Sequence, residues 1–145
     1  NFPNRLLSDG KTQVKNWLEI GASSWGDADN FVGDFSNFGK KTVDLFSPGG
    51  DIYSTIPGGT YKNNNGTSMA APVAAGVAAV LMSYYPELSA LQVKDILMKS
   101  ALKDYQNFKI AKPGGAGEEG EPEMIKFGEL SISGGLVNAY EAVKM

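Results

Sequence analysis

The longest apolar segment of the chain runs from Ser68 to Tyr85 and stops before Pro86. Small apolar residues fill most of it, and it carries no charged side chain. Its length predicts a helix, and an apolar surface on all sides predicts contact with protein on nearly every side, as in the centre of an α/β domain. A membrane span is disfavoured, because Ala and Gly dominate the segment, Leu occurs once and Pro72 lies near its start.

Shorter apolar runs on either side predict the remaining elements. Residues 17–24 are predicted to form a buried strand, and residues 43–46 and 52–55 form β-prone runs between turns rich in glycine and proline. A second, amphipathic helix is predicted to begin at Ser89, because apolar residues recur after it at helical spacing. Gln92 follows three residues later and gives the S-x-x-Q form of a capping box.

The C-terminal third has the weakest pattern. Residues 105–133 hold five acidic groups among glycines and prolines, which predicts a surface loop excursion. The segment "EEGEPE" lacks the alternating ligand spacing of a calcium loop, so a solvated loop is favoured over a metal site. The chain is then predicted to close with a short helix that docks through Leu136, Val137 and Ala139.

Composition narrows the class of protein. The chain has 145 residues, 42% of them hydrophobic and 20% charged, which is typical of one soluble globular domain. A net charge of −3 gives no reason to expect nucleic acid or an anionic membrane as a partner. The absence of cysteine and histidine excludes disulfides, thiolate chemistry and the usual zinc ligands, and no metal site is predicted.

The start of the chain is unusual for a natural protein. It opens "NFPNRLLSDG", without an initiator Met, a basic start or the apolar core of a signal peptide. We therefore expect residue 1 to be a cut or trimmed end.

The polar tip of the apolar helix, "NGTSMAAP", is the main candidate for chemistry. Backbone N–H groups in the first turn of a helix have no partner within the helix and carry the positive end of its dipole. A serine there can act as a nucleophile, with its own N–H stabilising the oxyanion that attack creates. Local chemistry alone favours a simpler interpretation, in which Thr67 or Ser68 is an N-cap.

The wider pattern reverses that preference. The segment "GTSMAAPVAAGVAAVL" resembles the active-site serine segment of subtilisin-like serine peptidases, G-T-S-M-A-[SA]-P-H-V-A-G. Three more segments, "LEIGASS", "FSNFGKKTVDLFSPGGDIYST" and "GGLVNAYEAV", are similar to further segments of that family. All four occur in the family's order and together cover roughly residues 17–101 and 133–143.

The resemblance implies a fold and the part of that fold that this chain would form. Residues 1–145 would be the C-terminal part of a single subtilase peptidase domain of α/β class. That domain has three layers, with a mostly parallel central sheet and a buried helix after the nucleophile. The segments that carry the family's Asp and His come before the match begins.

The resemblance also implies roles for single residues. Ser68 would be the nucleophile of a Ser-His-Asp triad. Asn65 and Gly66 would flank the substrate near the scissile bond, Asn64 would face the leaving-group side, and Thr67 would complete this substrate-binding stretch. Two further positions are also informative. Asn1 is placed near the floor of the primary specificity pocket, and Val73 replaces the family's usual histidine, which is not a triad member.

Two functions from different classes follow from these residues. The first is a serine endopeptidase that works through an acyl-enzyme on Ser68, with this chain alone inactive because it has no His to act as the base. The second is a non-catalytic subtilase-like binding or structural module. An Asp and a His upstream of residue 1 would separate the two. An unrelated α/β binding domain fits the composition but not the order of the motifs.

The expected partners depend on the same resemblance. They are a peptide or protein substrate and the remainder of the peptidase domain, or a second copy of the chain where that remainder is missing. No cofactor is predicted, although calcium sites are common in the family. Most relatives are secreted, which implies a secreted or extracytoplasmic location.

Overall fold

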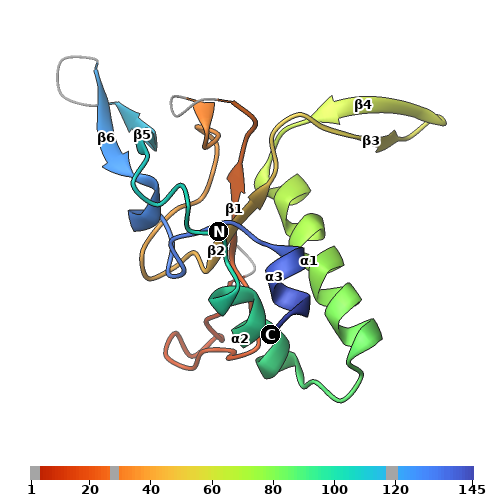
Figure 1. The fold of residues 1–145 in the computed structure, drawn as a ribbon. Helices are drawn as coiled ribbons and strands as arrows, with labels where there is room; N and C mark the ends of the chain where they lie inside the picture. Colours follow the sequence, from red (N-terminus) through yellow and green to blue (C-terminus); the bar gives the residue numbers. More distant parts are fainter. Residues whose placement is uncertain (1–3, 27–29, 117–120) are drawn as a thin grey trace.

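The protein's structure, a computed structural model, describes residues 4–26, 30–116 and 121–145. Two hairpins lie at one end of the molecule, and two short helices lie at the other (Figure 1). In chain order the elements are the strands β1 (Ile20–Ser23), β2 (Leu45–Pro48), β3 (Ile52–Ile56) and β4 (Thr60–Asn64), the helices α1 (Thr67–Tyr84) and α2 (Ala90–Lys99), the strands β5 (Lys109–Ala116) and β6 (Pro122–Lys126), the 3-10 helix η3 (Phe127–Glu129) and the helix α3 (Ala139–Val143).

A short parallel sheet forms the centre, as predicted for the α/β class. β1 and β2 pair in parallel, with Gly21 opposite Phe46. Beyond β2 the chain adds a further parallel bridge between Phe46 and Leu136, where the N–H of Phe46 donates to the Gly135 carbonyl at 3.0 Å and the N–H of Val137 donates to the Phe46 carbonyl at 2.8 Å. The other strands form two separate antiparallel hairpins, β3–β4 and β5–β6.

The two faces of the sheet bury different cores. Gly21 and Phe46 share one face, and a Cβ on Gly21 would lie 2.5 Å from the Phe46 ring, so only glycine fits. Around that ring lies an aromatic and aliphatic core that includes Phe31, Val32, Val43, Ile110, Phe127 and Leu130. On the opposite side of the molecule α1, α2 and α3 pack together around Leu81, Val93, Leu97 and Ala142.

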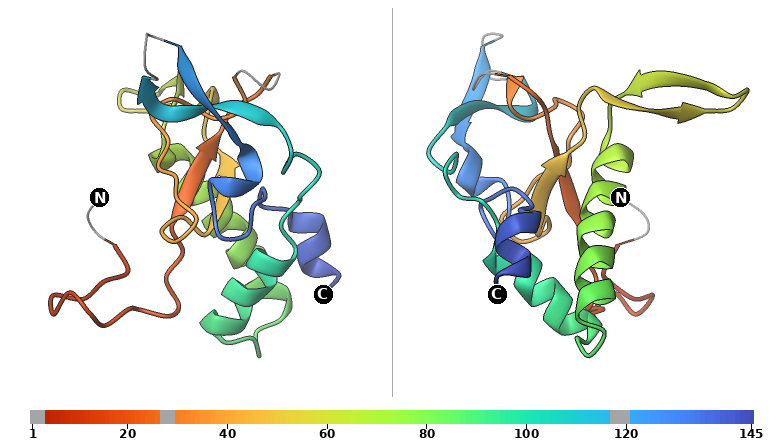
Figure 2. Two further views of the ribbon diagram at one scale, coloured as in Figure 1. Left: turned by 90° about the vertical axis from the view of Figure 1, so that its left-hand side faces the viewer. Right: turned by 45° about the vertical axis from the view of Figure 1, so that its right-hand side comes forward.

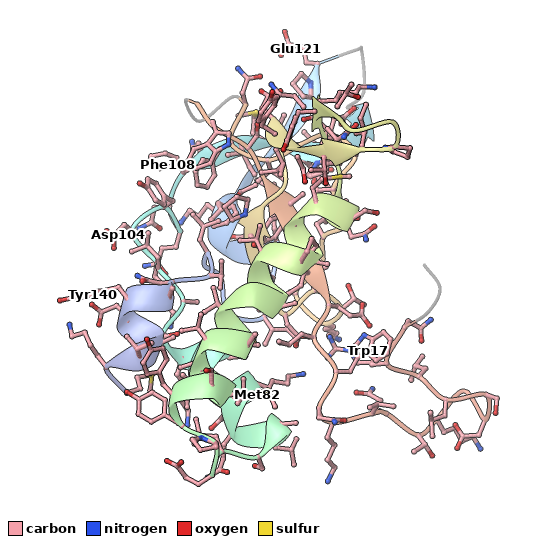
Figure 3. The ribbon with its side chains drawn as sticks, turned by 90° about the vertical axis from the view of Figure 1, so that its right-hand side faces the viewer. Trp17, Met82, Asp104, Phe108, Glu121 and Tyr140 are labelled. Atoms are coloured by element: carbon pink, nitrogen blue, oxygen red, sulfur yellow. The ribbon has the colours of Figure 1, made fainter. Side chains whose placement is uncertain are left out.

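Helix α1 begins one residue earlier than predicted and lies against both central strands. Its buried residues, Ala70, Ala74 and Leu81, form a single face. The opposite face lies open, with no other element in front of it (Figure 3), and Met82 there is 49% exposed. The predicted contact on nearly all sides is therefore not made by the described residues of this chain. By length and hydropathy alone α1 also qualifies as a membrane span. We assign it to the protein domain because it packs on β1 and β2.

The two shorter helices confirm the local signals in the sequence. Ser89 and Gln92 form the predicted capping box: the Ser89 N–H donates to the Gln92 side chain at 2.9 Å, and the Gln92 N–H donates to the Ser89 hydroxyl. Asn138 caps α3 by accepting from the Glu141 N–H at 3.1 Å. One detail of the predicted docking is wrong, because Ala139 is exposed and Ala142, one turn later, is buried in its place.

The predicted surface loop at residues 105–133 is wrong for most of its length. This part of the chain forms β5, β6 and η3, and it buries Ile110, Phe127 and Leu130 in the aromatic core. The glycines, prolines and acidic groups dominate the sequence signal, whereas the apolar residues at the base of the hairpin pack around Phe46. Residues 117–120, which hold part of the acidic run, lie outside the described residues.

Candidate active site

Ser68 is the second residue of α1, and its side chain is exposed. Gly66 is the N-cap, and no side chain caps this helix. The interpretation of Thr67 or Ser68 as an N-cap is therefore wrong. Within the part of the chain that the structure describes, the Ser68 hydroxyl has no hydrogen-bond partner. It is free to meet a ligand.

The first turn of α1 presents free backbone donors beside this hydroxyl. The N–H groups of Met69 and Ala70 donate to the Gly66 carbonyl at 3.0 and 3.2 Å. Those of Thr67 and Ser68 have no acceptor among the described residues. Unpaired N–H groups at a helix start carry partial positive charge and suit a developing oxyanion.

Glycines hold the loop before Ser68 against the ends of the central strands. Gly66 has φ +156° and ψ +159°, a backbone region open almost only to glycine. Its N–H donates to the Gly49 carbonyl at 2.8 Å, and the Gly49 N–H donates to the Ser23 carbonyl at 2.8 Å. Ser68 therefore lies at the carboxyl ends of β1 and β2, where open α/β sheets bind their ligands.

Replacing Gly49 by alanine should displace the start of α1. A Cβ at Gly49 would lie 2.7 Å from the Gly66 carbonyl oxygen and 2.9 Å from the Ala70 Cβ, so the loop or the helix must move. We expect Gly49→Ala to lower the free energy of unfolding by about 1–3 kcal/mol, the usual cost of overpacking, as measured by urea titration.

A matched glycine on α1 provides the control. A Cβ at Gly76 would meet nothing within 4 Å. Gly76→Ala is therefore expected to raise the free energy of unfolding by up to about 1 kcal/mol, because alanine is the better helix former. Equal effects of the two substitutions would contradict the close packing of Gly49 against the serine loop.

The predicted substrate-binding stretch forms one continuous segment between β4 and α1. Asn64 ends β4, and Asn65, Gly66 and Thr67 lead from it to Ser68. The Asn65 side-chain oxygen accepts from the Asp51 N–H at 2.6 Å, so this amide ties the base of the β3–β4 hairpin to the serine loop. Contact of these residues with substrate stays a prediction.

Two other predicted positions have different outcomes. Asn1, placed by the resemblance near the specificity pocket, lies outside the described residues. Val73 is half-buried on α1, on the turn of the helix that follows Ser68.

A cleft of about 500 Å³ opens beside Ser68. Its walls are the first turn of α1, the segment that leads into β1, and part of the segment between β1 and β2; the lining residues are Trp17, Leu18, Glu19, Ile20, Phe35, Asn37, Val43, Thr67, Ser68 and Ala71. Glu19 is the one titratable side chain in this lining, and its carboxylate accepts from the Arg5 backbone N–H and Nε at 3.1 and 3.3 Å. The cleft thus holds the exposed Ser68 hydroxyl and oriented donors, and Glu19, the one base in its lining, is bonded to Arg5.

The predicted absence of a metal site or cofactor stays a prediction. The described residues contain no group of three or more His, Cys, Asp or Glu side chains that could hold an ion.

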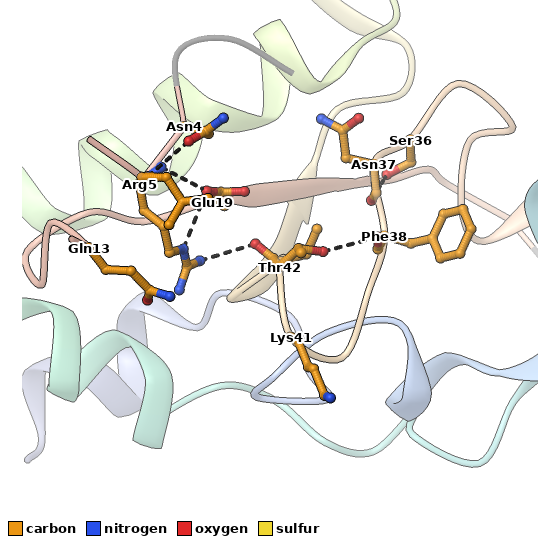
Figure 4. Close-up of a pocket in the computed structure, with 11 residues that line it drawn as sticks. Asn4, Arg5, Gln13, Glu19, Ser36, Asn37, Phe38, Lys41 and Thr42 are labelled. Carbon is orange, nitrogen blue, oxygen red and sulfur yellow. Dashed lines mark hydrogen bonds and ion pairs between the residues drawn. The ribbon is translucent and has the colours of Figure 1, made fainter. Parts of the chain in front are cut away.

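A second cavity, of about 450 Å³, shares Glu19, Asn37 and Val43 with the lining of the cleft (Figure 4). Beside it lies a charged cluster centred on Asp44, whose side chain is 2% exposed. The Arg5 guanidinium donates to Asp44 at 2.7 Å, and the Lys94 ammonium lies 3.3 Å from its other oxygen.

The charged cluster was missed at the level of sequence. The available signal was one acidic residue, Asp44, inside the buried run 43–46, because a buried carboxylate requires partners. The cluster also supports the cleft, since Lys94 donates to the Trp17 carbonyl at 2.5 Å and Asp44 accepts from the Glu19 N–H at 2.8 Å.

Comparison with known proteins places the chain in a class. The sequence pattern of the subtilase family matches residues 5–121, so the chain belongs to the subtilase family. Over 78 residues it is 44% identical to subtilisin DY of Bacillus licheniformis, which covers 54% of this chain and 28% of that protein. Over 84 residues it is 40% identical to a cell wall-associated protease of Bacillus subtilis (strain 168), covering 58% of this chain and 9% of that protein.

Solved structures agree with this class. A cold-adapted subtilisin-like serine proteinase matches with a TM-score of 0.55 and 38% identity, over 63% of this chain and 32% of the other. A chain from a subtilase cytotoxin structure shares the fold, with a TM-score of 0.63 and 24% identity over 88% of this chain and 36% of the other. The chain therefore spans about a third or less of the proteins it is similar to.

Proposed function

We propose that this chain supplies the nucleophile of a subtilase-type serine endopeptidase. The Ser68 oxygen attacks the carbonyl carbon of a peptide bond, and the proton it loses passes to a general base. The oxyanion formed meets the Ser68 N–H, the C–N bond breaks as the leaving amine takes the proton, and water then hydrolyses the acyl-enzyme. Asn64, Asn65, Gly66 and Thr67 line the path of the substrate on either side of the scissile bond.

One observation carries this proposal. Ser68 is exposed, has no hydrogen-bond partner among the described residues, and lies at the start of α1 beside a cleft, within the family's serine motif. The relatives at 38–44% identity are named as subtilisins or proteases.

The base and its partner come from outside the chain in this proposal. The sequence has no histidine, and the cleft offers only Glu19, already bonded to Arg5. Residues 1–145 are then the C-terminal part of one peptidase domain, and the remainder of that domain brings the His and Asp and covers the open face of α1. Where the remainder is absent, the same open face favours association between copies of the chain.

The proposal includes a cellular location, and it does not include a cofactor. A secreted or extracytoplasmic place is supported by the relative that is named as cell wall-associated. The substrate is a peptide or protein, which is supported by the names of the relatives as subtilisins or proteases.

The decisive experiment compares the chain alone with the chain joined to the remainder of its domain. We expect the chain alone to release no product from fluorescent casein, whereas the joined protein cleaves casein and is labelled at Ser68 by a fluorophosphonate probe. Mass spectrometry of the labelled peptide identifies the serine. Inhibitor-sensitive cleavage by the chain alone would contradict the need for an outside base. A joined protein that neither cleaves nor labels would favour the non-catalytic module.

A further inference from the structure

One wall of the cleft has no role in the proposed chemistry. It belongs to the described segment 30–44, which leads from β1 to β2 and runs back beside the central strands (Figure 2). Three consecutive residues of this segment separate the cleft from the second cavity: Phe35 lines the cleft, Ser36 lines the second cavity, and Asn37 lines both. We call residues 35–37 the partition.

The partition belongs to no helix or strand, so its position depends on single contacts. The Ser36 N–H donates to the Gly33 carbonyl at 2.8 Å and closes a turn. The Phe35 ring folds back onto this turn, where a Cβ on Gly33 would overlap the ring. These contacts shape the partition, but they lie within residues 33–36 and do not hold it against the rest of the protein.

The Ser36 hydroxyl joins the partition to the central sheet. Its oxygen accepts from the N–H of Ala22, a residue of β1, at 2.8 Å, and its proton is donated to the Asn37 carbonyl at 2.9 Å (Figure 4). Both ends of the first bond are buried, since Ala22 is 0% and Ser36 6% exposed. Among the described residues, no other hydrogen bond joins residues 34–38 to β1.

Loss of this hydroxyl would act on the cleft rather than on the nucleophile. The buried Ala22 N–H would lose its acceptor, which favours movement of the partition until water or another group reaches that N–H. Because Asn37 lines both cavities, such a movement changes the width of the cleft beside Ser68. The serine keeps its own support, since the Gly66 N–H donates to the Gly49 carbonyl independently of the partition.

We propose that Ser36 is a positioning residue of the peptidase. Its hydroxyl fixes Phe35 and Asn37 as a wall of the cleft, and this wall determines how a bound substrate is held beside Ser68. The inference rests on the proposed endopeptidase function. It gives Ser36 a role in substrate binding and none in the bond-breaking steps, because Ser36 is buried and lines the second cavity instead of the cleft.

Steady-state kinetics of the joined protein test this role. The substrate is a fluorogenic peptide that copies a casein sequence cut by the joined protein. Ser36→Ala should raise KM about 10-fold and change kcat less than about twofold, because a displaced wall weakens binding without touching the reacting groups. A wild-type KM in a folded Ser36→Ala variant would overturn the proposal.

Phe35→Ala tests whether Ser36 acts through the partition. Phe35 is 49% exposed, so the protein should tolerate the loss of its ring. This variant should raise KM by a similar factor, and the double variant should raise it no further, because both substitutions remove the same wall. Independent effects would multiply to about 100-fold and would overturn the proposal. So would a wild-type KM in Phe35→Ala, even if Ser36→Ala did not fold.

Ser131→Ala provides the matched control. Ser131 is 0% exposed and its hydroxyl accepts from the Gly134 N–H at 3.1 Å, but it lines neither cavity. This variant should lower the urea midpoint of unfolding, as Ser36→Ala does, and leave KM unchanged. An equal rise of KM in both variants would overturn the positioning role alone. A wild-type joined protein that neither cleaves casein nor reacts with a fluorophosphonate would overturn the proposed function, and the role of Ser36 with it.

Discussion

Ser68→Ala should reduce peptide hydrolysis by the joined peptidase by about a millionfold. In subtilisin, a relative of this chain, removing the serine alone costs about as much as removing the whole triad. The reason is physical: without the hydroxyl no acyl-enzyme forms, and the oriented N–H groups of α1 can then stabilise only a slow direct attack by water. Stopped assays with fluorescent casein measure the loss.

A second serine on the same helix separates chemistry from folding. Ser83 is exposed near the C-terminal end of α1. Ser83→Ala should keep full activity in the joined protein, because Ser83 lies at the end of α1 opposite Ser68. In the chain alone, where both serines are exposed, each variant should have the free energy of unfolding of wild type to within about 0.5 kcal/mol. Inhibitor-sensitive activity left in Ser68→Ala would show that another residue is the nucleophile.

The sequence predicts the parts of the fold whose signals are local. The capping box of Ser89 and Gln92 depends on residues three apart, and the strand, turn and helix order up to α1 depends on runs of a few residues. The loop prediction for residues 105–133 is wrong because the apolar residues there are few and lie among residues typical of turns. Their burial depends on Phe46 and Phe31, which come much earlier in the chain.

The candidate site also has features that the local sequence predicts and features that it does not. Ser68 could be found because its motif is contiguous, and the order of four motifs made that motif specific. The N-cap interpretation of Thr67 or Ser68 could not be excluded from the local sequence, since the position of the cap depends on the backbone of Gly66 and on the packing of Gly49 against β1. The charged cluster brings together Arg5, Asp44 and Lys94, whose pairing no local pattern could reveal.

The open face of α1 is apolar in sequence but exposed in the structure. An apolar helix with only three buried residues is unusual for a self-contained domain, yet the segment has no charge on any side. Both observations agree with the proposal that the remainder of the peptidase domain covers this face.

Asp44→Ala should be the most destabilising single substitution outside the apolar core, lowering the free energy of unfolding by about 3–5 kcal/mol. The carboxylate accepts from Arg5 and the Glu19 N–H and lies 3.3 Å from Lys94, and the side chains of Arg5 and Lys94 are only 14% and 19% exposed. Removing the anion leaves the largely buried Lys94 ammonium without its ion pair and Arg5 with Glu19 as its remaining carboxylate, which costs more than the lost attraction alone. Urea unfolding followed by tryptophan fluorescence measures the change.

An exposed aspartate–lysine pair on α2, the helix that carries Lys94, supplies the comparison. Asp95 and Lys99 lie 2.6 Å apart, but their side chains are 65% and 63% exposed, so Asp95→Ala should cost no more than about 0.5 kcal/mol. The two variants should also differ at the active site. Only Asp44→Ala removes the support of residues 17–20, which wall the cleft, so only this variant should slow fluorophosphonate labelling of Ser68 in the joined protein. Equal stability of the two variants would show that Arg5 and Lys94 reach water or other partners when Asp44 is absent, and that the cluster does not hold the cleft in place.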